Sequence, residues 1–418
     1  MNPINATIIT IGDELLIGQV IDTNSAYIAQ ALNKIGVPVL NRIAVGDNKD
    51  AIISALDAAA IKSNIVIITG GLGPTADDIT KPLLNAYFGG KMVVHQPSLD
   101  HITYIFETIH KRPMIDRNRK QAEVPDVCEV LFNEKGTAPG MLFKKDKVYY
   151  FSLPGVPHEM RWLTDNHVIP TIKKDFTPSF ICHRTLLTAG IGESFLAELI
   201  VNFENDLPTH IKLAYLPNIG MVRLRLTGSG KDEKSIENEV AAQFDQLKLA
   251  VNDYLVTDSD EPMEVVVGNL LKQRNQTVAT AESCTGGFIG HLLSKNAGSS
   301  QFYTGGVISY DNRIKTEFLD VSTEILHTVG AVSKEAVEQM ALAVREKMNT
   351  DYAISVSGIM GPTGQTAEKP LGMVWVGVAN KEKVVSKVFY LRFDRLRNIE
   401  VTANQAINLL RLLIINKI

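Results

Sequence analysis

A serine in a glycine turn is the feature of the C-terminal half that is most able to do chemistry. Residues 281–287 read A-E-S-C-T-G-G, between a predicted strand and a predicted helix. A helix N-terminus exposes unpaired N–H groups with partial positive charge, and glycine lets a ligand approach the backbone closely. Ser283 is therefore a candidate nucleophile beside an oxyanion or phosphate site. Two alternatives are an N-cap serine without chemistry, and Cys284 as the nucleophile.

A serine nucleophile needs a base, and no histidine lies in an obvious partner position. Lys315 fits this role if it is buried, because desolvation disfavours the ammonium form and lowers the pKa. Tyr310 would relay a proton or donate to an oxyanion. Arg395, at the start of the last predicted helix, can bind an anion through two N–H groups. The alternatives are a solvated Lys315 at a helix start, and an Arg395 that pairs with Asp394 or Glu400.

Glycines and carboxylates follow two predicted strands of the N-terminal half. Residues 69–78 read T-G-G-L-G-P-T-A-D-D, before a helix expected from about Asp77, and residues 12–14 read G-D-E. Glycine backbone beside carboxylates is typical of a phosphate site with an oxygen-ligated cation such as Mg²⁺. The run is not a Walker A loop, because no Gly-Lys-Ser/Thr closes it. The alternative is a turn with helix-capping aspartates.

The elements that must position these residues alternate between strands and helices. Continuously apolar strands at 6–11 and 64–69, with helices between them, indicate a parallel sheet covered on both faces. A second such pattern follows the polar residues 257–262, and between the two lies a smaller pattern with a helix expected over 194–203. We predict an α/β protein in which two three-layer α/β domains, 1–172 and 258–418, are joined by a small α+β domain, 173–257.

Composition excludes several classes of protein. The chain has 418 residues, and its 42 Lys and Arg against 46 Asp and Glu give a net charge of −4, which argues against direct nucleic-acid binding. The three cysteines are far apart and form no C-x-x-C, so neither a disulfide framework nor a structural zinc site is expected. No apolar run approaches the roughly 20 residues that span a bilayer, and the start is unlike a signal peptide. We expect a cytoplasmic protein that does not bind membranes.

The C-terminal motifs together resemble the CinA C-terminal domain, the nicotinamide-nucleotide amidohydrolase family. The matching runs are A-E-S-C-T-G-G, residues 298–310, Lys315, G-A-V-S at 330–333, S-G-I-x-G-P at 357–362 and K-P-x-G-x-V-W at 369–375. The resemblance implies hydrolysis of nicotinamide mononucleotide to nicotinic acid mononucleotide and ammonia, without a cofactor. Met360 and Met373 stand where the family commonly has Ala and Thr, a difference that would alter the pocket volume.

The same resemblance assigns roles to individual residues of the C-terminal half. Ser283 would be the nucleophile, Lys315 its base and Tyr310 a further catalytic residue. The implied substrate contacts are Cys284, Thr285, Gly286, Gly287, Ser357, Gly358 and Arg395.

The N-terminal motifs resemble the molybdopterin-binding-like domain of the CinA family, which is associated with metal-dependent hydrolysis of the pyrophosphate of ADP-ribose. They are I-T-I-G-D-E-L-L-x-G, D-x-N, T-G-G-L-G-P-T-x-D-D, K-Q-A-x-x-P, G-T-A-P-G and P-G-V-P-x-E-M. The implied ligands of a divalent metal such as Mg²⁺ are Asp13, Glu14, Asp77 and Asp78. The implied nucleotide contacts are Gly12, Asn24, Gly70, Gly71, Gly73, Lys120, Pro154 and Gly155. Molybdopterin-handling proteins share the loop, so binding or adenylylation of molybdopterin is the alternative.

The middle segment resembles the small KH-type module of the same family. A KH domain that binds nucleic acid needs a G-x-x-G loop, which residues 227–230, T-G-S-G, do not supply. We therefore expect a spacer or a dimerisation element, and a homodimer. A non-enzymatic alternative is a competence or DNA-damage accessory protein that docks on a recombination protein.

Overall fold

The computed structural model describes residues 4–75, 78–178, 180–218 and 220–418. The chain divides into two compact units, residues 1–182 with 228–237 and residues 183–227 with 238–418, and each is described by itself. Within the described residues, none of the helices combines the length and the apolar character needed to cross a bilayer.

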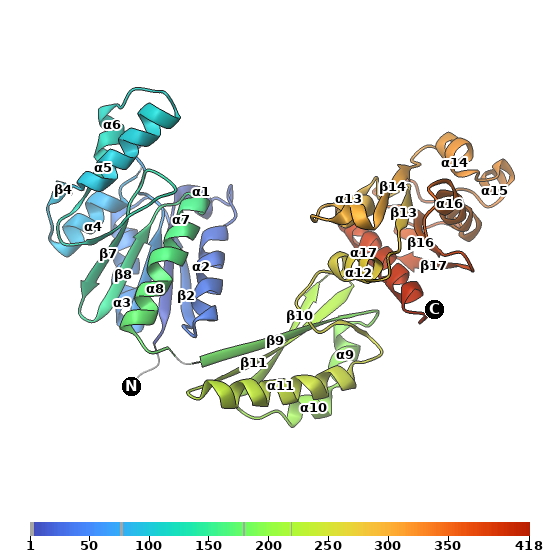
Figure 1. The fold of residues 1–418 in the computed structure, drawn as a ribbon, viewed down its shortest axis with the longest axis horizontal. Coiled ribbons are helices and arrows are strands. Elements are labelled where there is room, and N and C mark those ends of the chain that lie inside the picture. Colours follow the sequence, from blue (N-terminus) through green and yellow to red (C-terminus); the bar gives the residue numbers. More distant parts are fainter. Residues whose placement is uncertain (1–3, 76–77, 179, 219) are drawn as a thin grey trace. The chain divides into compact units, whose positions relative to one another are not determined.

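The N-terminal domain is a six-stranded sheet between two helical layers (Figure 1). In spatial order its strands are β2 (Val39–Val45), β1 (Ala6–Ile11), β3 (Ile65–Thr69), β8 (Val148–Leu153), β7 (Gly140–Lys145) and β6 (Glu129–Leu131). The strands from β2 to β8 pair in parallel, whereas the β8–β7 and β7–β6 pairs are antiparallel. The continuously apolar β1 and β3 are fully buried, as expected for strands covered on both faces.

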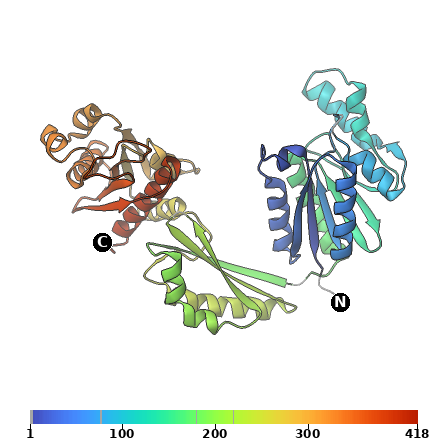
Figure 2. The same ribbon diagram turned by 180° about the vertical axis from the view of Figure 1, so that it is seen from behind.

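Two separate hydrophobic clusters lie on the two faces of this sheet. One contains Ile28 and Leu32 of α2 (Thr23–Lys34) with side chains of α7 (Pro157–Leu163) and α8 (Ile169–Asp175). The other joins α3 (Lys49–Lys62) and α4 (Thr80–Phe88) to the opposite face. Figure 2, from behind, shows the blue helices α2 and α3 on opposite sides of the sheet. The remaining α-helices and strands are α1 (Asp13–Leu16), the β4 (Met92–Val94) and β5 (Glu123–Pro125) pair, α5 (Gln96–Thr103) and α6 (Asp116–Arg119).

The small middle domain has a four-stranded sheet with helices. Its strands, in spatial order, are β10 (Ile211–Asn218), β11 (Met221–Gly230), β9 (Phe180–Ala189) and β12 (Leu255–Thr257), and its long helix is α11 (Glu233–Ala250). The helix expected over 194–203 is instead two short helices, α9 (Glu193–Leu199) and α10 (Val201–Asn205). Ile200, which separates them, has non-helical backbone angles and a buried side chain.

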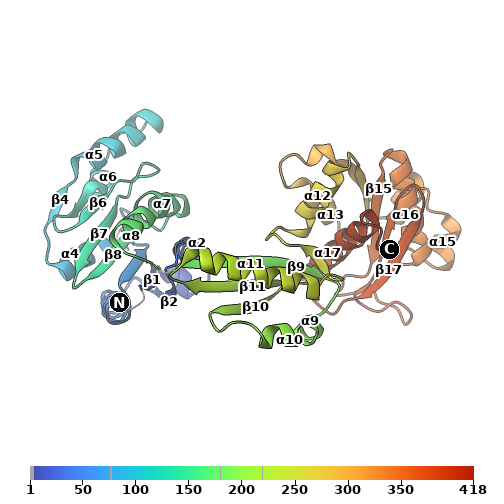
Figure 3. The same cartoon turned by 60° about the horizontal axis from the view of Figure 1, so that its bottom comes forward.

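The C-terminal domain repeats the three-layer arrangement around a five-stranded sheet. In spatial order its strands are β14 (Tyr303–Ile308), β13 (Val278–Glu282), β15 (Tyr352–Gly358), β16 (Met373–Ala379) and β17 (Val384–Tyr390), of which the first three are parallel. The helices α12 (Met263–Gln273), α13 (Phe288–Ser294) and α17 (Arg395–Ile414) pack in one cluster, and α14 (Asn312–Leu319), α15 (Thr323–Thr328) and α16 (Lys334–Lys347) contribute to a second. Figure 3 shows α13 and α16 on opposite sides of β15.

Candidate active sites at the ends of parallel strands

The parallel strands of each sheet bring the chemistry-bearing residues to one edge. In the C-terminal domain Glu282 of β13 is in register with Ile308 of β14 and Val356 of β15, so Ser283 and Ser309, which follow two of these residues, lie side by side. In the N-terminal domain Thr69 pairs with both Thr10 and Leu153. Ligands of open α/β sheets bind at the carboxyl ends of the strands, which are the edges where both predicted sites lie.

Ser283 and Lys315 are in contact at the C-terminal site. The Nζ of Lys315 lies 3.2 Å from the Oγ of Ser283, and both side chains are buried. Lys315 is only 1% exposed, so the alternative of a solvated lysine at a helix start is wrong. Burial lowers the pKa of Lys315 below its ordinary value, because desolvation disfavours the ammonium.

Two carbonyl groups orient the Lys315 amine. Its Nζ donates to the carbonyl of Ser309 at 2.6 Å and to that of Tyr310 at 3.4 Å. The Ser309 N–H in turn donates to the Glu282 carbonyl at 2.7 Å, which ties this loop to the end of β13. The loop after β14 therefore places the lysine beside the serine.

Ser283 is not a helix N-cap, so that alternative is also wrong. Helix α13 begins only at Phe288, with Gly287 as its N-cap residue in the left-handed conformation. The group that receives the N–H bonds of this helix start is the buried carboxylate of Glu282. The sequence motifs gave Glu282 no role; its signal is that it is the one charged residue of β13, which reads V-A-T-A-E.

Cys284 lies buried next to Ser283. Burial raises the pKa of its thiol to about 12, so the thiol is protonated at neutral pH. A thiol of this kind is a poor nucleophile, since the thiolate is the reactive form. The geometry favours Ser283 over Cys284.

Arg395 uses its two terminal nitrogens within the protein. One donates to the Gly361 carbonyl at 2.7 Å and the other to the hydroxyl of Tyr310 at 2.9 Å. The alternative of an Arg395 ion pair with Asp394 or Glu400 is wrong, because Asp394 caps α17 and Glu400 pairs with Arg397. Tyr310 is 63% exposed, and its hydroxyl bonds to Arg395; the proton relay from Lys315 through this hydroxyl stays a prediction.

The other predicted C-terminal residues surround this centre. Thr285 donates to Glu282, and Gly286 and Gly287 have positive φ, at 61° and 97°. Ser357 and Gly358 end β15, with Ser357 buried. Met360 is buried and its carbonyl accepts from Asn398, whereas Met373 begins β16 and is half-buried.

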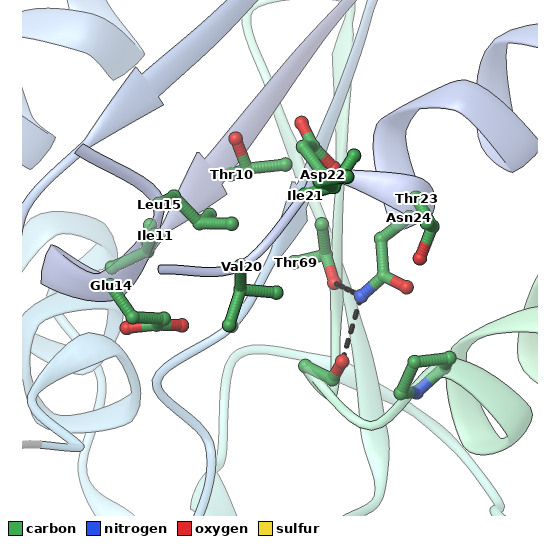
Figure 4. Close-up of a pocket in the computed structure, with 13 residues that line it drawn as sticks. Thr10, Ile11, Glu14, Leu15, Val20, Ile21, Asp22, Thr23, Asn24 and Thr69 are labelled. Atoms are coloured by element: carbon green, nitrogen blue, oxygen red, sulfur yellow. Dashed lines mark hydrogen bonds between the residues drawn. The ribbon is translucent and has the colours of Figure 1, made fainter. Parts of the chain in front are cut away.

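The N-terminal strand ends form a cavity that Figure 4 shows in close-up. Asn24 donates through its Nδ2 to the Gly155 carbonyl at 2.7 Å and to the Thr69 hydroxyl at 3.3 Å, and Thr69 donates to the Pro154 carbonyl at 2.9 Å. Asn24, Gly70 and Gly155 line this cavity, together with Glu14. Thr69, which the motif analysis left without a role, links the three chain segments.

A second cavity of about 480 Å³ adjoins the first along the glycine loop. It is lined by the three predicted glycines of the loop, Gly70, Gly71 and Gly73, and by Pro154 and Gly155. Its volume is within the roughly 300–1,000 Å³ of small-molecule sites. Of the other predicted contacts, Gly12 lies against the Glu14 side chain, while Lys120 is exposed; its neighbours Asn118 and Gln121 line the cavity.

The predicted metal ligands are only partly brought together. Glu14 and Asp78 line the second cavity, but Asp78 accepts from the N–H groups of Gly73 and Thr75, and Asp13 accepts from the N–H of Asp47. Asp77 lies outside the described residues. Among the residues that are described, no group of three or more His, Cys, Asp or Glu side chains is arranged to hold a metal ion. The described members of the predicted set, Asp13, Glu14 and Asp78, are therefore not arranged as a metal site on their own.

Comparison with known proteins identifies the family. Three family models match in order: "Probable molybdopterin binding domain" over residues 7–174, "Damage-inducible protein CinA KH domain" over 183–257 and "CinA C-terminal domain" over 260–414. A CinA-like protein of Flavobacterium psychrophilum is 44% identical over 97% of both chains. The chain belongs to the CinA family.

A second relative matches over nearly its whole length, and a solved structure matches part of this chain. A CinA-like protein of Cytophaga hutchinsonii is 46% identical over 98% of this chain and 97% of its own. Among solved structures, the competence/damage inducible protein CihA of Agrobacterium tumefaciens is 34% identical, covers 36% of this chain and 93% of its own, and has a TM-score of 0.36.

Proposed function

We propose that the C-terminal domain hydrolyses the carboxamide of nicotinamide mononucleotide to nicotinic acid mononucleotide and ammonia. The observation that carries this proposal is the buried contact of 3.2 Å between the Lys315 Nζ and the Ser283 Oγ. A hydroxyl beside a lysine of lowered pKa is an activated nucleophile for acyl transfer.

The uncharged Lys315 amine has two hydrogens and one lone pair, and a hydrogen-bond partner lies within reach of each. In the uncharged form the carbonyl groups of Ser309 and Tyr310 accept the two hydrogens. The lone pair is then left to accept from the Ser283 hydroxyl, the reverse of the bond that the charged amine donates to the Ser283 Oγ. Lys315 takes the serine proton while Oγ attacks the carboxamide carbon. It then returns the proton to the departing nitrogen as the C–N bond breaks, which releases ammonia and leaves an acyl ester. Water, deprotonated by Lys315, then attacks the ester carbon. The bond between that carbon and the Ser283 Oγ breaks, Lys315 returns the proton to Oγ, and the acid is released.

The backbone beside Ser283 offers donors for the oxyanion. The Ser283 N–H donates to the Val356 carbonyl. The N–H groups of Gly286 and Phe288 donate to carbonyl groups within the turn. Among the described residues, the N–H groups of Cys284 and Thr285 donate to no carbonyl or side-chain oxygen, so they are the donors we assign to the developing negative charge. Arg395 and Tyr310, on the exposed side, would contact the nucleotide part of the substrate.

For the N-terminal domain we propose hydrolysis of the pyrophosphate of ADP-ribose. The support is the pair of cavities that share Gly70 and Gly155. The second runs along Gly70–Gly73, where the N–H groups of Gly71 and Leu72 have no acceptor among the described residues. Such donors bind phosphate oxygens. A divalent metal held by Glu14, Asp78, Asp77 and Asp13 stays a prediction.

A substrate assay with and without chelator tests both proposals. Incubation with nicotinamide mononucleotide should release ammonia equally in either condition, whereas cleavage of ADP-ribose should stop in chelator and return with added Mg²⁺. Ser283→Ala should abolish only the first reaction. Full ammonia release by that variant would show that the assigned nucleophile is wrong.

One observation favours a second function for the N-terminal domain. The family model that matches residues 7–174 is described as a probable molybdopterin binding domain. That function predicts tight pterin binding and no turnover of ADP-ribose, so titration with a pterin separates the two. A homodimer and a protein partner in recombination also stay predictions; size-exclusion chromatography and a pull-down with Ser283→Ala protein test them.

A further inference from the structure

The carboxylate of Glu282 is the most heavily bonded side chain beside the proposed nucleophile. Its Oε2 accepts from the Thr285 hydroxyl at 2.7 Å and from the N–H groups of Gly287 and Ile289 at 3.1 and 3.0 Å, and its Oε1 accepts from the N–H of Gly290 at 2.8 Å. The side chain is 1% exposed. A buried carboxylate is costly unless it is hydrogen-bonded, and these four bonds meet that requirement.

Glu282 also holds the lysine side of the site through its backbone. Its carbonyl accepts from the Ser309 N–H at 2.7 Å, and the Ser309 carbonyl accepts from the Lys315 Nζ at 2.6 Å. One residue, adjacent in sequence to Ser283, therefore connects the turn that carries the nucleophile to the loop that orients the base.

The bonds to Glu282 decide which backbone donors remain for a ligand. A free helix N-terminus would offer several N–H groups to an anion. Here the N–H groups of Gly287, Ile289 and Gly290 are already bonded to the protein's own carboxylate. The N–H groups of Cys284 and Thr285 lie in the turn between Ser283 and this helix start, and their direction depends on how the turn is fixed.

We propose that Glu282 is a positioning residue: its carboxylate occupies the start of α13 and fixes the 283–287 turn so that the N–H groups of Cys284 and Thr285 face the reacting carbonyl. This inference rests on the proposed function of the Ser283 site, whose backbone geometry Glu282 would fix. The small residue Gly290 permits the arrangement, because a Cβ there would lie 2.5 Å from the Tyr303 hydroxyl and 3.4 Å from the Glu282 Oε1.

The test is Glu282→Gln, which keeps the shape but replaces one acceptor oxygen with an amide nitrogen. We expect kcat for nicotinamide mononucleotide to fall about 10²- to 10³-fold, the usual loss when one oxyanion donor is removed, with KM changed less than about threefold. The matched control is Glu264→Gln, which removes another buried carboxylate of the same domain, paired at 2.7 Å with Lys295. It should lower the melting temperature and leave kcat within about twofold.

The pH profile separates positioning from general loosening of the fold. The Glu282 carboxylate bonds to residues 285–290, whereas the Lys315 Nζ bonds to Ser283, Ser309 and Tyr310, so Glu282→Gln should lower the plateau of the rate and leave its midpoint within about half a pH unit. Loosening would admit water to Lys315 and move the midpoint upward. A wild-type kcat in Glu282→Gln, or equal losses in Glu282→Gln and Glu264→Gln, would overturn the inference.

Two further measurements keep the outcome decisive. If Glu282→Gln does not fold, Thr285→Val removes one of the four bonds, and a fall in kcat of about tenfold is expected; an unchanged kcat overturns the inference. The rate at which phenylmethylsulfonyl fluoride labels Ser283 reports the same site without the nucleotide. Labelling that slows in Glu282→Gln but not in Glu264→Gln supports positioning even if nicotinamide mononucleotide is not the substrate. A wild-type protein that neither releases ammonia nor reacts overturns both proposals.

Discussion

Each of the two α/β domains buries one lysine near its candidate site, and the two lysines differ in what they touch. Lys81 of α4 donates to the Gln121 carbonyl at 2.8 Å, beside the N-terminal cavity, whereas Lys315 of α14 contacts a serine hydroxyl. Burial lowers the pKa of both, that of Lys81 to about 8. Both lysines therefore have a lowered pKa. Only Lys315 is a candidate base, because only Lys315 has a serine hydroxyl within reach.

The two sites also treat the ends of their parallel strands differently. The N-terminal domain leaves an open cavity lined by glycines, and the N–H groups of Gly71 and Leu72 in its lining have no acceptor among the described residues. The C-terminal domain fills the corresponding edge with buried polar side chains, among them Glu282, Ser283 and Lys315. The first arrangement suits binding of a large charged ligand, and the second suits covalent catalysis at one carbonyl carbon.

The change with the largest expected effect is Ser283→Ala. Loss of the nucleophile should lower ammonia release by at least about 10⁴-fold, since removal of a serine nucleophile leaves only the residual rate from binding and the oxyanion site. Cleavage of ADP-ribose should not change. Cys284→Ala is the control and should keep the rate within about tenfold; the reverse order of the two variants would contradict the assignment.

Replacing the base should have the next largest effect. Lys315→Met should lower kcat about 10³-fold, within the range for general-base catalysis. In the wild type only the uncharged amine accepts the serine proton, so kcat/KM should rise with pH through one ionisation below the ordinary lysine pKa of 10.5. The buried Lys81 is the control, because Lys81→Met should leave the profile unchanged. A flat profile in the wild type would speak against a lysine base.

Gly70→Ala tests the cavity side of the comparison. Gly70 has φ of 114°, and a Cβ there would lie 2.2 Å from the Ile11 carbonyl oxygen, so the loop must move. ADP-ribose cleavage should fall about 10²-fold, and ammonia release should be unaffected. Gly89→Ala also has positive φ, at 74°, but no atom lies within 4 Å of its Cβ. An equal loss in both variants would show that backbone strain, and not the shape of the cavity, is responsible.

Arg395→Ala should have a smaller effect, on binding. It removes the bonds to the Gly361 carbonyl and the Tyr310 hydroxyl together with the proposed contact to the nucleotide, so KM for nicotinamide mononucleotide should rise about tenfold with little change in kcat. Arg395→Lys should not restore KM, because lysine lacks the planar fork. Arg397→Ala, which breaks an exposed pair with Glu400, is the control. A fall in kcat alone would place Arg395 at the reacting carbonyl instead.

The smallest effect concerns stability alone. The folded-state pKa of Lys81, about 8, lies below its ordinary value, so the charged form is penalised at pH 7 and the penalty disappears between about pH 8 and 10.5. Lys81→Met should therefore raise the free energy of unfolding above that of the wild type. This gain should be larger at pH 7 than at pH 10 by on the order of 2 kcal/mol. The exposed Lys62→Met should show no such difference in urea unfolding.

Much of the fold, and part of the C-terminal site, was predictable from the sequence. The parallel strands follow from their apolar runs, and strand order places Ser283 and the loop before Lys315 at the same sheet edge. The burial of Lys315 did not follow, because α14 reads N-R-I-K-T-E-F-L and its local pattern is largely polar. The position of Asp13 was equally hidden, since its partner Asp47 lies in the distant loop after β2. The burial of Lys315 and the position of Asp13 both depend on contacts between residues far apart in the sequence, which no local pattern encodes.

The most direct test of the central claim is to trap the acyl ester. The reaction with nicotinamide mononucleotide is quenched in acid, and the peptide that contains residues 283 and 284 is analysed by mass spectrometry in the wild type, Ser283→Ala and Cys284→Ala. We predict an added acyl mass in the wild type and in Cys284→Ala, and none in Ser283→Ala. An adduct that persists in Ser283→Ala and disappears in Cys284→Ala would contradict the account.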